Sequence, residues 1–344
     1  MSLRVAYWTS AFEVDMEAIA SEVAQLRNAF PGSVIWGIGP PNGRWLSWRK
    51  GFRFHPRLYW PFLAVTRLLQ VRFDIQHLFG GVNDWYHLKA VRARPVVLTA
   101  ALPCLPGTDI RLLRKVDRFV VEWPGGASEL ERLGISADRI RLIYPPVDTQ
   151  RFSPMLPPQG PFTVLFASSP QPKSWLVGRG LRILLEAASL RPHMRFRLIW
   201  RPWGDSLQEI RSWIESRGLA NVELIVGRLS NMPQEYQRAH VTTAPFTDGT
   251  QVKPVPNSIL ESLACGRPVA ITSCVGVADI VKEAGAGVVC VADGAALAEA
   301  LDCLQTNWAE FSARASRLAK ERFSLEAFVA GYRCLYHELC VLAK

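Results

Sequence analysis

The sequence predicts an α/β protein made of two doubly wound domains with parallel sheets. Its 344 residues exceed one ordinary α/β core and suit two domains of about 150 residues each. Short apolar runs of strand length alternate with amphipathic helical patterns, and this alternation occurs twice along the chain. Nearly continuous apolar strands between helices are typical of parallel sheets covered on both faces.

In the first half, strands are expected at residues 3–8, 34–37, 73–79, 95–102, 118–123 and 139–144, and helices at 16–29 and 127–134. In the second half, strands are expected at 162–168, 194–200, 222–227, 241–246, 268–273 and 287–291. Helices are expected there at 180–190, 205–217, 232–240 and 258–266, with a mostly helical remainder. Gly266 suits the left-handed position that ends a helix.

A proline-rich stretch separates the two series of elements. Prolines stand at positions 145, 146, 154, 157, 158 and 161. Proline fixes φ and cannot donate to a sheet, so this stretch is expected to be a stiff connector. We therefore divide the chain into an N-terminal domain (1–155), a C-terminal domain (156–322) and a last segment (323–344). That segment is expected to pack back on the N-terminal domain.

Composition excludes several classes of protein. Apolar residues make up 49% and charged residues 20%, which argues against disorder. The seven cysteines form no Cys-x-x-Cys pair, so neither a disulfide framework nor a zinc site is expected. No secretory signal is recognised, and the longest apolar run, Leu58–Val71, is interrupted by Pro61 and Arg67. These features predict a cytoplasmic protein, whose charge of +10 suggests anionic partners.

The segment of residues 248–272 is the strongest candidate for a binding site. A strand ends at 246, a loop follows, and a helix then begins near Ser258. In doubly wound sheets, ligands lie at the carboxyl ends of strands, where helix N-termini attract phosphate. Ser258 could contact such a phosphate, and Glu261, one turn further, could accept the hydroxyl groups of a ribose. The alternative is that both residues only cap the helix.

Three segments carry a resemblance to a known family. They are RIRLIYPPVDTQRFSP (139–154), RGLRILLEAASL (179–190) and the stretch Ser258–Val269, which contains ESLACGRPV. In this order and spacing they resemble the interdomain, phosphate-loop and donor-helix motifs of glycosyltransferase family 4 (group 1). The resemblance implies the GT-B architecture, in which two Rossmann-like domains face each other across a cleft.

The resemblance also implies a reaction. A sugar, of hexosyl type, would move from a nucleotide diphosphate sugar to an acceptor hydroxyl, with retained anomeric configuration and with neither a metal ion nor a cofactor. Cationic side chains and a helix N-terminus would then stabilise the leaving diphosphate. The implied catalytic residues are Arg179, Lys253 and Glu261. The implied donor-binding residues are Lys173, Arg179, Asp248, Ser258, Ile259 and Glu261, although a lone loop lysine such as Lys173 is usually just solvated.

Three features depart from the family pattern. Lys253 stands eight positions before Glu261, near where the family often has an acid that engages the sugar, so Asp248 could replace that acid. The loop of residues 10–18 has three acids and no glycine, which suits a hydroxyl-rich or cationic acceptor better than a phosphate. Ala100 and Ala101 stand where the family often has histidine. His77 and His87 are possible replacements, or are structural residues.

Residues 42–62 interleave cations with aromatic side chains: Arg44, Arg49, Lys50, Arg53 and Arg57 with Trp45, Trp48, Phe52, Phe54, Tyr59 and Trp60. This pattern suits an anionic membrane surface, single-stranded nucleic acid, or a loop anchored on its own domain. No RNA-binding motif supports nucleic acid. The expected partners are therefore a nucleotide-sugar donor, a carbohydrate or lipid-linked acceptor, and the inner face of the cytoplasmic membrane as a peripheral attachment.

Two alternatives to an active transferase stay open. A catalytically degenerate GT-B domain would bind a nucleotide sugar or a protein without turnover, and Lys253 and the missing histidine favour it. A GT-B epimerase would act on its donor without an acceptor. Ser258, Glu261 and Arg179 favour an active enzyme.

Overall fold

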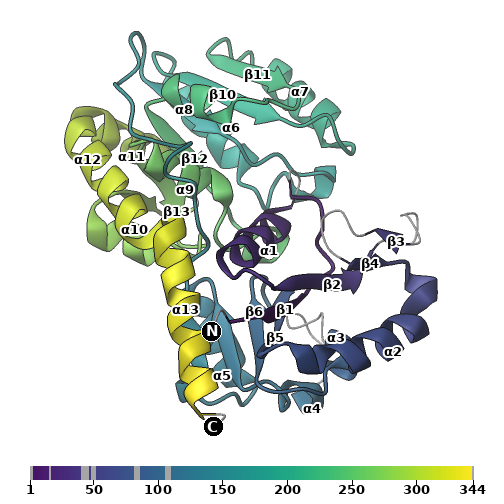
Figure 1. Cartoon of the computed structure of the whole chain (residues 1–344). Helices are drawn as coiled ribbons and strands as arrows, with labels where there is room; N and C mark the ends of the chain where they lie inside the picture. Colours follow the sequence, from purple (N-terminus) through teal and green to yellow (C-terminus); the bar gives the residue numbers. More distant parts are fainter. Residues whose placement is uncertain are drawn as a thin grey trace. The chain divides into compact units, whose positions relative to one another are not determined.

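The chain forms two compact units. The computed structural model describes residues 3–14, 17–39, 46–47, 52–80, 86–104 and 110–342. The first unit contains the chain up to Pro145 together with the segment from Phe328 onward, and the second unit is Pro146–Ala327. Figure 1 shows that each unit has a sheet with helices around it.

The first unit is built on an eight-stranded sheet. Its strands are β1 (Val5–Trp8), β2 (Val34–Ile38), β3 (Leu46–Ser47), β4 (Phe52–Phe54), β5 (Ile75–Gly80), β6 (Val96–Ala100), β7 (Arg118–Val121) and β8 (Ile140–Leu142). Their order is β3-β4-β2-β1-β5-β6-β7-β8. All neighbours are parallel except β3 and β4 at the edge. Strands β1, β5 and β6 are buried along their whole length, as continuous apolar runs predict.

The described helices of this unit include three, between residues 59 and 113, that the sequence analysis did not predict. They are α1 (Ala18–Ala29), α2 (Tyr59–Leu69), α3 (Tyr86–Ala90), α4 (Ile110–Leu113), α5 (Pro124–Arg132) and most of α13 (Leu325–Leu342), with short 3-10 turns at Pro56–Leu58, Gln70–Arg72 and Ala137–Arg139. Helix α2 forms despite Pro61, because Pro61 lies in the first turn, where a missing N–H breaks no helical hydrogen bond. Among the described residues, no helix is both long and apolar enough to cross a membrane.

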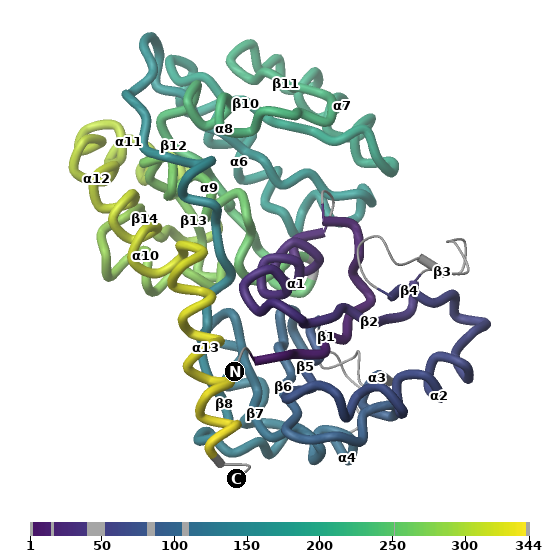
Figure 2. The backbone as a smooth tube through the Cα atoms, in the orientation of Figure 1, coloured from purple at the N-terminus to yellow at the C-terminus, as the bar shows by residue number. Residues whose placement is uncertain are grey.

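Helix α13 joins the first unit through buried polar contacts. The Nδ1 atom of His77 lies 2.6 Å from the Tyr336 hydroxyl, and its Nε2 atom lies 2.7 Å from Oγ1 of Thr99. The Thr99 hydroxyl lies 2.8 Å from that of Tyr332. All four side chains are fully buried. Figure 2 shows α13 running alongside β7 and β8 of the same unit.

The second unit contains a six-stranded, fully parallel sheet. Its strands are β9 (Thr163–Phe166), β10 (Arg195–Trp200), β11 (Val222–Val226), β12 (Val241–Ala244), β13 (Val269–Thr272) and β14 (Gly287–Cys290). The order is β11-β10-β9-β12-β13-β14. Its helices are α6 (Leu181–Leu190), α7 (Ser206–Ser216), α8 (Met232–Gln237), α9 (Asn257–Ala264), α10 (Ala278–Ala284), α11 (Gly294–Thr306) and α12 (Trp308–Leu318). A 3-10 turn at Lys173–Trp175 precedes α6, another at Gly249–Gln251 precedes α9, and a π-helical turn at Ala319–Phe323 follows α12.

The proline-rich connector is attached to the second unit. Val147 pairs with Ser324 in an isolated parallel bridge. The Arg267 guanidinium donates to the carbonyl oxygens of Met155 and Leu156 at 3.0 and 2.6 Å. These contacts explain why the second unit begins at Pro146, whereas the sequence analysis placed the boundary after residue 155.

Gly266 ends α9 as predicted. Its φ of +68° is left-handed, its N–H donates to Leu263 at 3.0 Å, and the N–H of Arg267 donates to Ser262 at 2.8 Å. This pair of bonds satisfies carbonyl groups at the helix end. The helix begins one residue earlier than expected, after Pro256, so Ser258 does not cap it.

Candidate functional site

The reversal of strand order in the second sheet locates the candidate site. Strands β9, β10 and β11 proceed in one direction, whereas β12, β13 and β14 proceed in the other, so the reversal lies between β9 and β12. In doubly wound sheets, ligands bind beyond the carboxyl ends of the strands at such a point. The segments that follow β9 and β12 contain Lys173, Arg179, Asp248 and Lys253, four of the residues predicted from the sequence.

These two segments are joined to each other. Thr247 donates its N–H to the carbonyl of Gly178 at 2.9 Å and its hydroxyl to that of Val177 at 3.1 Å. Gly180 has a φ of +69°, and a Cβ atom there would lie 1.7 Å from the carbonyl oxygen of Pro245. Glycine is therefore required at 180 both for the backbone conformation and for the close approach of the two segments.

Arg179 lies between the ends of the two central strands. Its Nη1 atom donates to the carbonyl and hydroxyl oxygens of Ser168, just beyond β9. Its Cζ atom lies 5.5 Å from the ring centroid of Phe246, just beyond β12. Burial lowers the pKa of Arg179 to about 10, which leaves the side chain cationic at neutral pH. Lys173 is different, because its side chain is exposed, whereas its backbone N–H donates to Asp205 at 2.7 Å and its backbone carbonyl accepts from Leu176 at 3.1 Å.

The N-terminus of α9 lacks a side-chain cap. Ser258 is partly exposed, and no hydrogen bond of its side chain caps this helix. The alternative that Ser258 merely caps α9 is therefore wrong. The side chain of Ile259 is fully buried and its N–H donates to Pro256 at 3.0 Å.

Glu261 lies one turn into α9, next to a buried tyrosine. The Tyr236 hydroxyl of α8 donates to Oε2 of Glu261 at 2.8 Å. Burial raises the pKa of Glu261 to about 7, against the opposing effects of the Tyr236 hydrogen bond and of the positive charges on Arg151 and Arg201. Part of Glu261 is exposed. A carboxylate held on one oxygen can offer the other to a ligand.

Asp248 and Lys253 lie on the loop between β12 and α9. Asp248 caps the 3-10 turn that follows it, because its Oδ1 atom accepts from the N–H and the hydroxyl of Thr250 at 2.9 and 2.6 Å. The same hydrogen bonds hold the pKa of Asp248 below its usual range. Lys253 is partly exposed.

Sequence reasoning missed Tyr236 and Arg267. Tyr236 is fully buried on α8, and no local pattern marks a tyrosine whose partner is 25 residues away. Arg267 is also fully buried, and its guanidinium donates to backbone carbonyls, including that of Tyr236 at 3.1 Å. The sequence contained one signal for Arg267: a charged residue placed between Gly266, which ends α9, and the buried strand β13. Arg267 thus holds the connector and α8 together.

The histidines proposed as replacements in the first unit are in its interior. His77 is fully buried in β5, and His87 is 1% exposed against the rings of Trp8 and Phe62. Burial lowers the pKa of each to about 3, so both are neutral at physiological pH. The suggestion that either histidine reaches a substrate is therefore wrong, and His77 is a structural residue.

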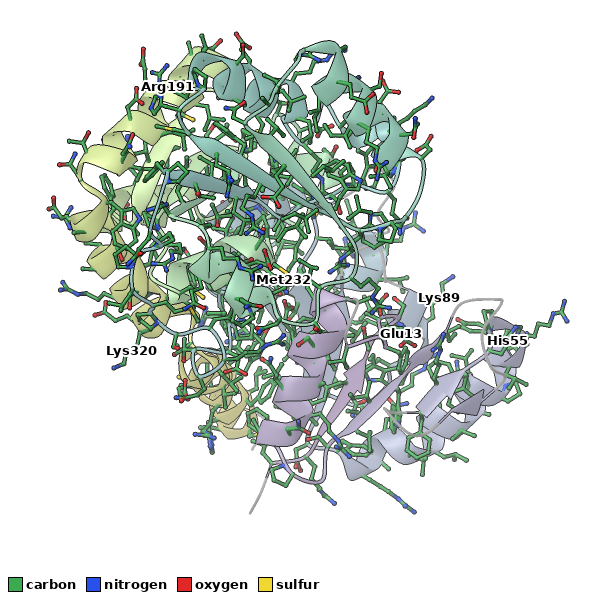
Figure 3. The ribbon with its side chains drawn as sticks, turned by 90° about the horizontal axis from the view of Figure 1, so that it is seen from above. Glu13, His55, Lys89, Arg191, Met232 and Lys320 are labelled. Atoms are coloured by element: carbon green, nitrogen blue, oxygen red, sulfur yellow. The ribbon has the colours of Figure 1, made fainter. Side chains whose placement is uncertain are left out.

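The acidic loop of residues 10–18 is largely engaged within its own unit. Glu13, labelled in Figure 3, forms an ion pair with Arg53 at 3.2 Å. Glu17 accepts the N–H groups of Phe12 and Glu13, each at 2.9 Å. The third acid, Asp15, lies outside the described residues. The two described acids therefore stabilise the loop itself.

The basic aromatic region is only partly described. Arg44, Trp45, Trp48, Arg49 and Lys50 lie outside the described residues. Of the remainder, Arg53 is directed toward its own unit by Glu13 and by the Phe12 ring, 5.6 Å away. His55, labelled in Figure 3, caps the turn before α2 by accepting from the N–H of Arg57 at 3.1 Å.

Comparison with known proteins relates the second unit to a family. Residues 163–307 match the family described as "Glycosyl transferases group 1". Every donor-site candidate lies within this range. The resemblance of this part of the chain to group 1 glycosyltransferases is thereby confirmed. No curated protein matches the chain.

Solved structures match almost the whole chain. HepE of Anabaena, solved in complex with UDP, has a TM-score of 0.77 at 15% identity over 98% of this chain and 100% of its own. A glycosyltransferase from Rickettsia africae has a TM-score of 0.78 at 16% identity over 98% of both chains. A sucrose-phosphate synthase from Thermosynechococcus elongatus has a TM-score of 0.74 at 16% identity over 99% of this chain and 100% of its own. The predicted fold class, two Rossmann-like domains of the GT-B type, is confirmed.

Proposed function

We propose that this chain is a glycosyltransferase that binds a nucleotide diphosphate sugar on its second unit and transfers the sugar to an acceptor hydroxyl. The observation that carries the proposal is the position of Arg179 between the ends of β9 and β12. Glu261 lies on α9, the helix that follows the loop after β12. The family match over residues 163–307 supports it. So does the fold shared with HepE, whose structure contains UDP.

The diphosphate of the donor would bind to Arg179 and to the N-terminus of α9. A planar guanidinium donates to two phosphate oxygens at once, and the contacts of Arg179 hold it in place before the ligand arrives. The uncapped N–H groups at the start of α9, including that of Ser258, would add positive potential. Lys173 and Lys253 would contribute further charge. These cations support a metal-independent reaction, because they can stabilise the departing diphosphate.

The ribose of the donor would bind to Glu261. The oxygen that Tyr236 does not occupy can accept a hydroxyl hydrogen, and an ionised carboxylate accepts more strongly than a neutral one. Because the pKa of Glu261 is about 7, donor binding and ionisation are coupled. Ile259 would support the site from behind, since its side chain is buried and its N–H donates to Pro256.

The transferred group is proposed to be a hexosyl unit, and its anomeric configuration to be retained. In a front-face reaction the leaving phosphate accepts the proton of the acceptor, so few protein acids or bases are required. Asp248 and Lys253, on the loop after β12, would recognise the sugar. The acceptor is proposed to be a carbohydrate or a lipid-linked hydroxyl.

A hydrolysis assay tests the reaction without knowledge of the acceptor. The chain is incubated with UDP-, GDP-, ADP- and TDP-hexoses in the presence of a chelator, and the released sugar is followed by NMR. We expect slow hydrolysis of one donor, with initial release of the anomer that the donor carries. Initial release of the opposite anomer would contradict retention, and dependence on added magnesium would contradict metal independence.

The second candidate is a GT-B domain that binds a nucleotide sugar without turnover. It is favoured by Lys253 in place of the usual acid and by Ala100 and Ala101, which are 1% and 0% exposed and offer no functional group. The two candidates differ in one result. A donor that binds tightly but is neither hydrolysed nor transferred over a long incubation supports the binding domain.

A further inference from the structure

Helix α2 of the first unit is apolar on both of its faces. Its inner face is buried through Phe62, Leu63 and Thr66. Its outer face exposes large apolar side chains as well. They are Trp60 (75% exposed), Val65 (43%), Leu68 (76%) and, just beyond the helix, Val71 (74%). A helix that is apolar all round is normally covered on all sides.

The exposed side chains form one continuous surface. Trp60, Ala64 and Leu68 are four residues apart, so they lie above one another along the helix, and Val65 lies beside them. In Figure 1, α2 lies at the periphery of the first unit. Scattered exposed apolar residues are ordinary, but a stripe along three turns marks an interaction surface.

The charge around this surface has a single sign. Between Val23 and Phe73 the sequence contains no Asp or Glu. Three arginines are exposed here, Arg67 in α2 and Arg57 and Arg72 in the 3-10 turns on either side of it. No ion pair in the described part of the chain engages them. This contrasts with Arg53, which is paired with Glu13.

A further cation lies behind the helix. Lys115 donates from Nζ to the carbonyl of Leu88 at 2.8 Å. Its pKa is lowered, first by burial and then by the positive charges of Arg92 and Arg67. Lys115, Arg92 and Arg67 are therefore like charges within electrostatic reach of one another. An anionic partner is favoured on this side.

Three kinds of partner can cover an apolar stripe edged by arginines. A second copy of the chain in a symmetric dimer would bring like arginines together at the same stripe. Single-stranded nucleic acid requires a series of aromatic platforms, whereas here Trp60 is followed by aliphatic side chains. The interface of an anionic bilayer accepts tryptophan and aliphatic side chains beneath arginines that reach the headgroups.

We propose that the α2 face, defined by Trp60, Val65, Leu68 and Val71 with Arg57, Arg67 and Arg72, docks on an anionic membrane surface with the helix axis parallel to the bilayer. The sequence analysis assigned this role to residues 42–62. Residues 42–45 and 48–51 of that range lie outside the described residues. We place the surface at residues 57–72, because Arg53 pairs with Glu13 and the centroids of the Phe54 and Phe62 rings lie 5.1 Å apart. This inference does not depend on the donor chemistry of the second unit.

The experiment is flotation of the full chain with vesicles of phosphatidylcholine alone or with about 30% phosphatidylglycerol. We expect binding to the anionic vesicles, which weakens as salt shortens the electrostatic range. The variant Trp60→Ser/Leu68→Ser should lower partition about tenfold or more. Arg67→Gln and Arg72→Gln should each lower it about fivefold.

The matched control is Leu156→Ser/Val291→Ser, which removes two apolar side chains of the second unit that are 87% and 71% exposed. It should bind vesicles like the unaltered chain. All variants should keep the circular dichroism and the nucleotide-sugar binding of the unaltered chain, which separates this proposal from the proposed function. The proposal is overturned if anionic vesicles are not bound at low salt, or if the α2 variants bind them as well as the control. Dimerisation or oligonucleotide binding through the α2 face without vesicle binding would also overturn it.

Discussion

Tyr236, on α8, donates its hydroxyl hydrogen to Oε2 of Glu261, one turn into α9, across 2.8 Å. The tyrosine is fully buried, whereas Glu261 is partly exposed. One carboxylate oxygen is thereby fixed and the other stays available to a ligand. The same hydrogen bond lowers the pKa of Glu261, which burial raises to about 7. Tyr236 is therefore proposed as a positioning residue for donor binding.

The hydrogen bond between Tyr236 and Glu261 should affect how donor affinity changes with pH. In the unaltered chain, affinity for a nucleotide diphosphate sugar should increase as pH rises through about 7, because Glu261 ionises there. Both phosphates of such a donor are diesters and do not titrate in this range. In Tyr236→Phe the increase should move to higher pH, since a stabilising hydrogen bond to the carboxylate is lost. Isothermal titration at several pH values measures this shift.

Glu261→Gln is the matched control, and its affinity should be lower and independent of pH. Tyr332→Phe removes the hydroxyl of another fully buried tyrosine, one that belongs to the first unit. It should leave the profile unchanged. An unshifted profile in Tyr236→Phe would remove the positioning role.

Gly180→Ala should disturb the candidate site through the backbone. Its Cβ would lie 1.7 Å from the Pro245 carbonyl oxygen, so the two segments that hold Arg179 must separate. Gly218→Ala has a similar φ of +60° with nothing near the added Cβ. Both changes carry a conformational cost of about 1 kcal/mol. Gly180→Ala alone should also lower donor affinity, and equal affinities of the two variants would contradict the proposed arrangement.

The buried His77 should make stability depend on pH. Its pKa is about 3 in the folded chain and near 6.5 when unfolded, so the unfolded state binds more protons between these values. This contribution to stability is complete above pH 6.5 and is lost as pH falls. Its slope is at most about 1.4 kcal/mol per pH unit. Urea unfolding from pH 7.5 to 5 should therefore show a smaller slope in His77→Gln than in the exposed control His337→Gln. Equal slopes would show that His77 does not titrate on unfolding.

Arg267 should be one of the most sensitive structural positions of the second unit. Its guanidinium is fully buried and donates to the carbonyls of Tyr236, Met155 and Leu156. Arg267→Ala leaves these acceptors unsatisfied, so the free energy of unfolding should fall by about 3 to 5 kcal/mol. The exposed Arg317→Ala should change it by less than about 0.5 kcal/mol. A similar small change for both variants in urea unfolding would contradict the role given to Arg267.

The sequence predicted those features whose cause is local. The alternation of apolar runs placed the strands of both sheets except β3 and β4 at the edge of the first sheet. Gly266 marked the end of α9 because a left-handed residue favours glycine. Helix α2 was missed since Pro61 was taken to interrupt an apolar run, although proline is tolerated in a first turn. Helix α10 was also missed, because its seven residues are too few to show a clear helical pattern of apolar side chains.

The residues that sequence reasoning missed depend on contacts between distant segments. Tyr236 acquires its role from Glu261, and Arg267 from carbonyl groups of the connector. His77 stands near a strand end in the sequence, yet the helix from Leu325 onward covers it with Tyr336. Nothing in the residues next to these positions reveals such partners. Their roles can be recognised only from the contacts of the folded chain.

The most direct test of the central claim is donor binding by the chain and two variants. Titration calorimetry with UDP-, GDP-, ADP- and TDP-sugars should detect one class of donor that binds the unaltered chain. Glu261→Ala and Arg179→Ala should each weaken that donor at least about tenfold, since each loses a charge-assisted contact. Lys173→Ala, at an exposed loop position, should weaken it less. If no nucleotide sugar binds, or if both variants bind it as tightly as the unaltered chain, the donor site is not where we place it.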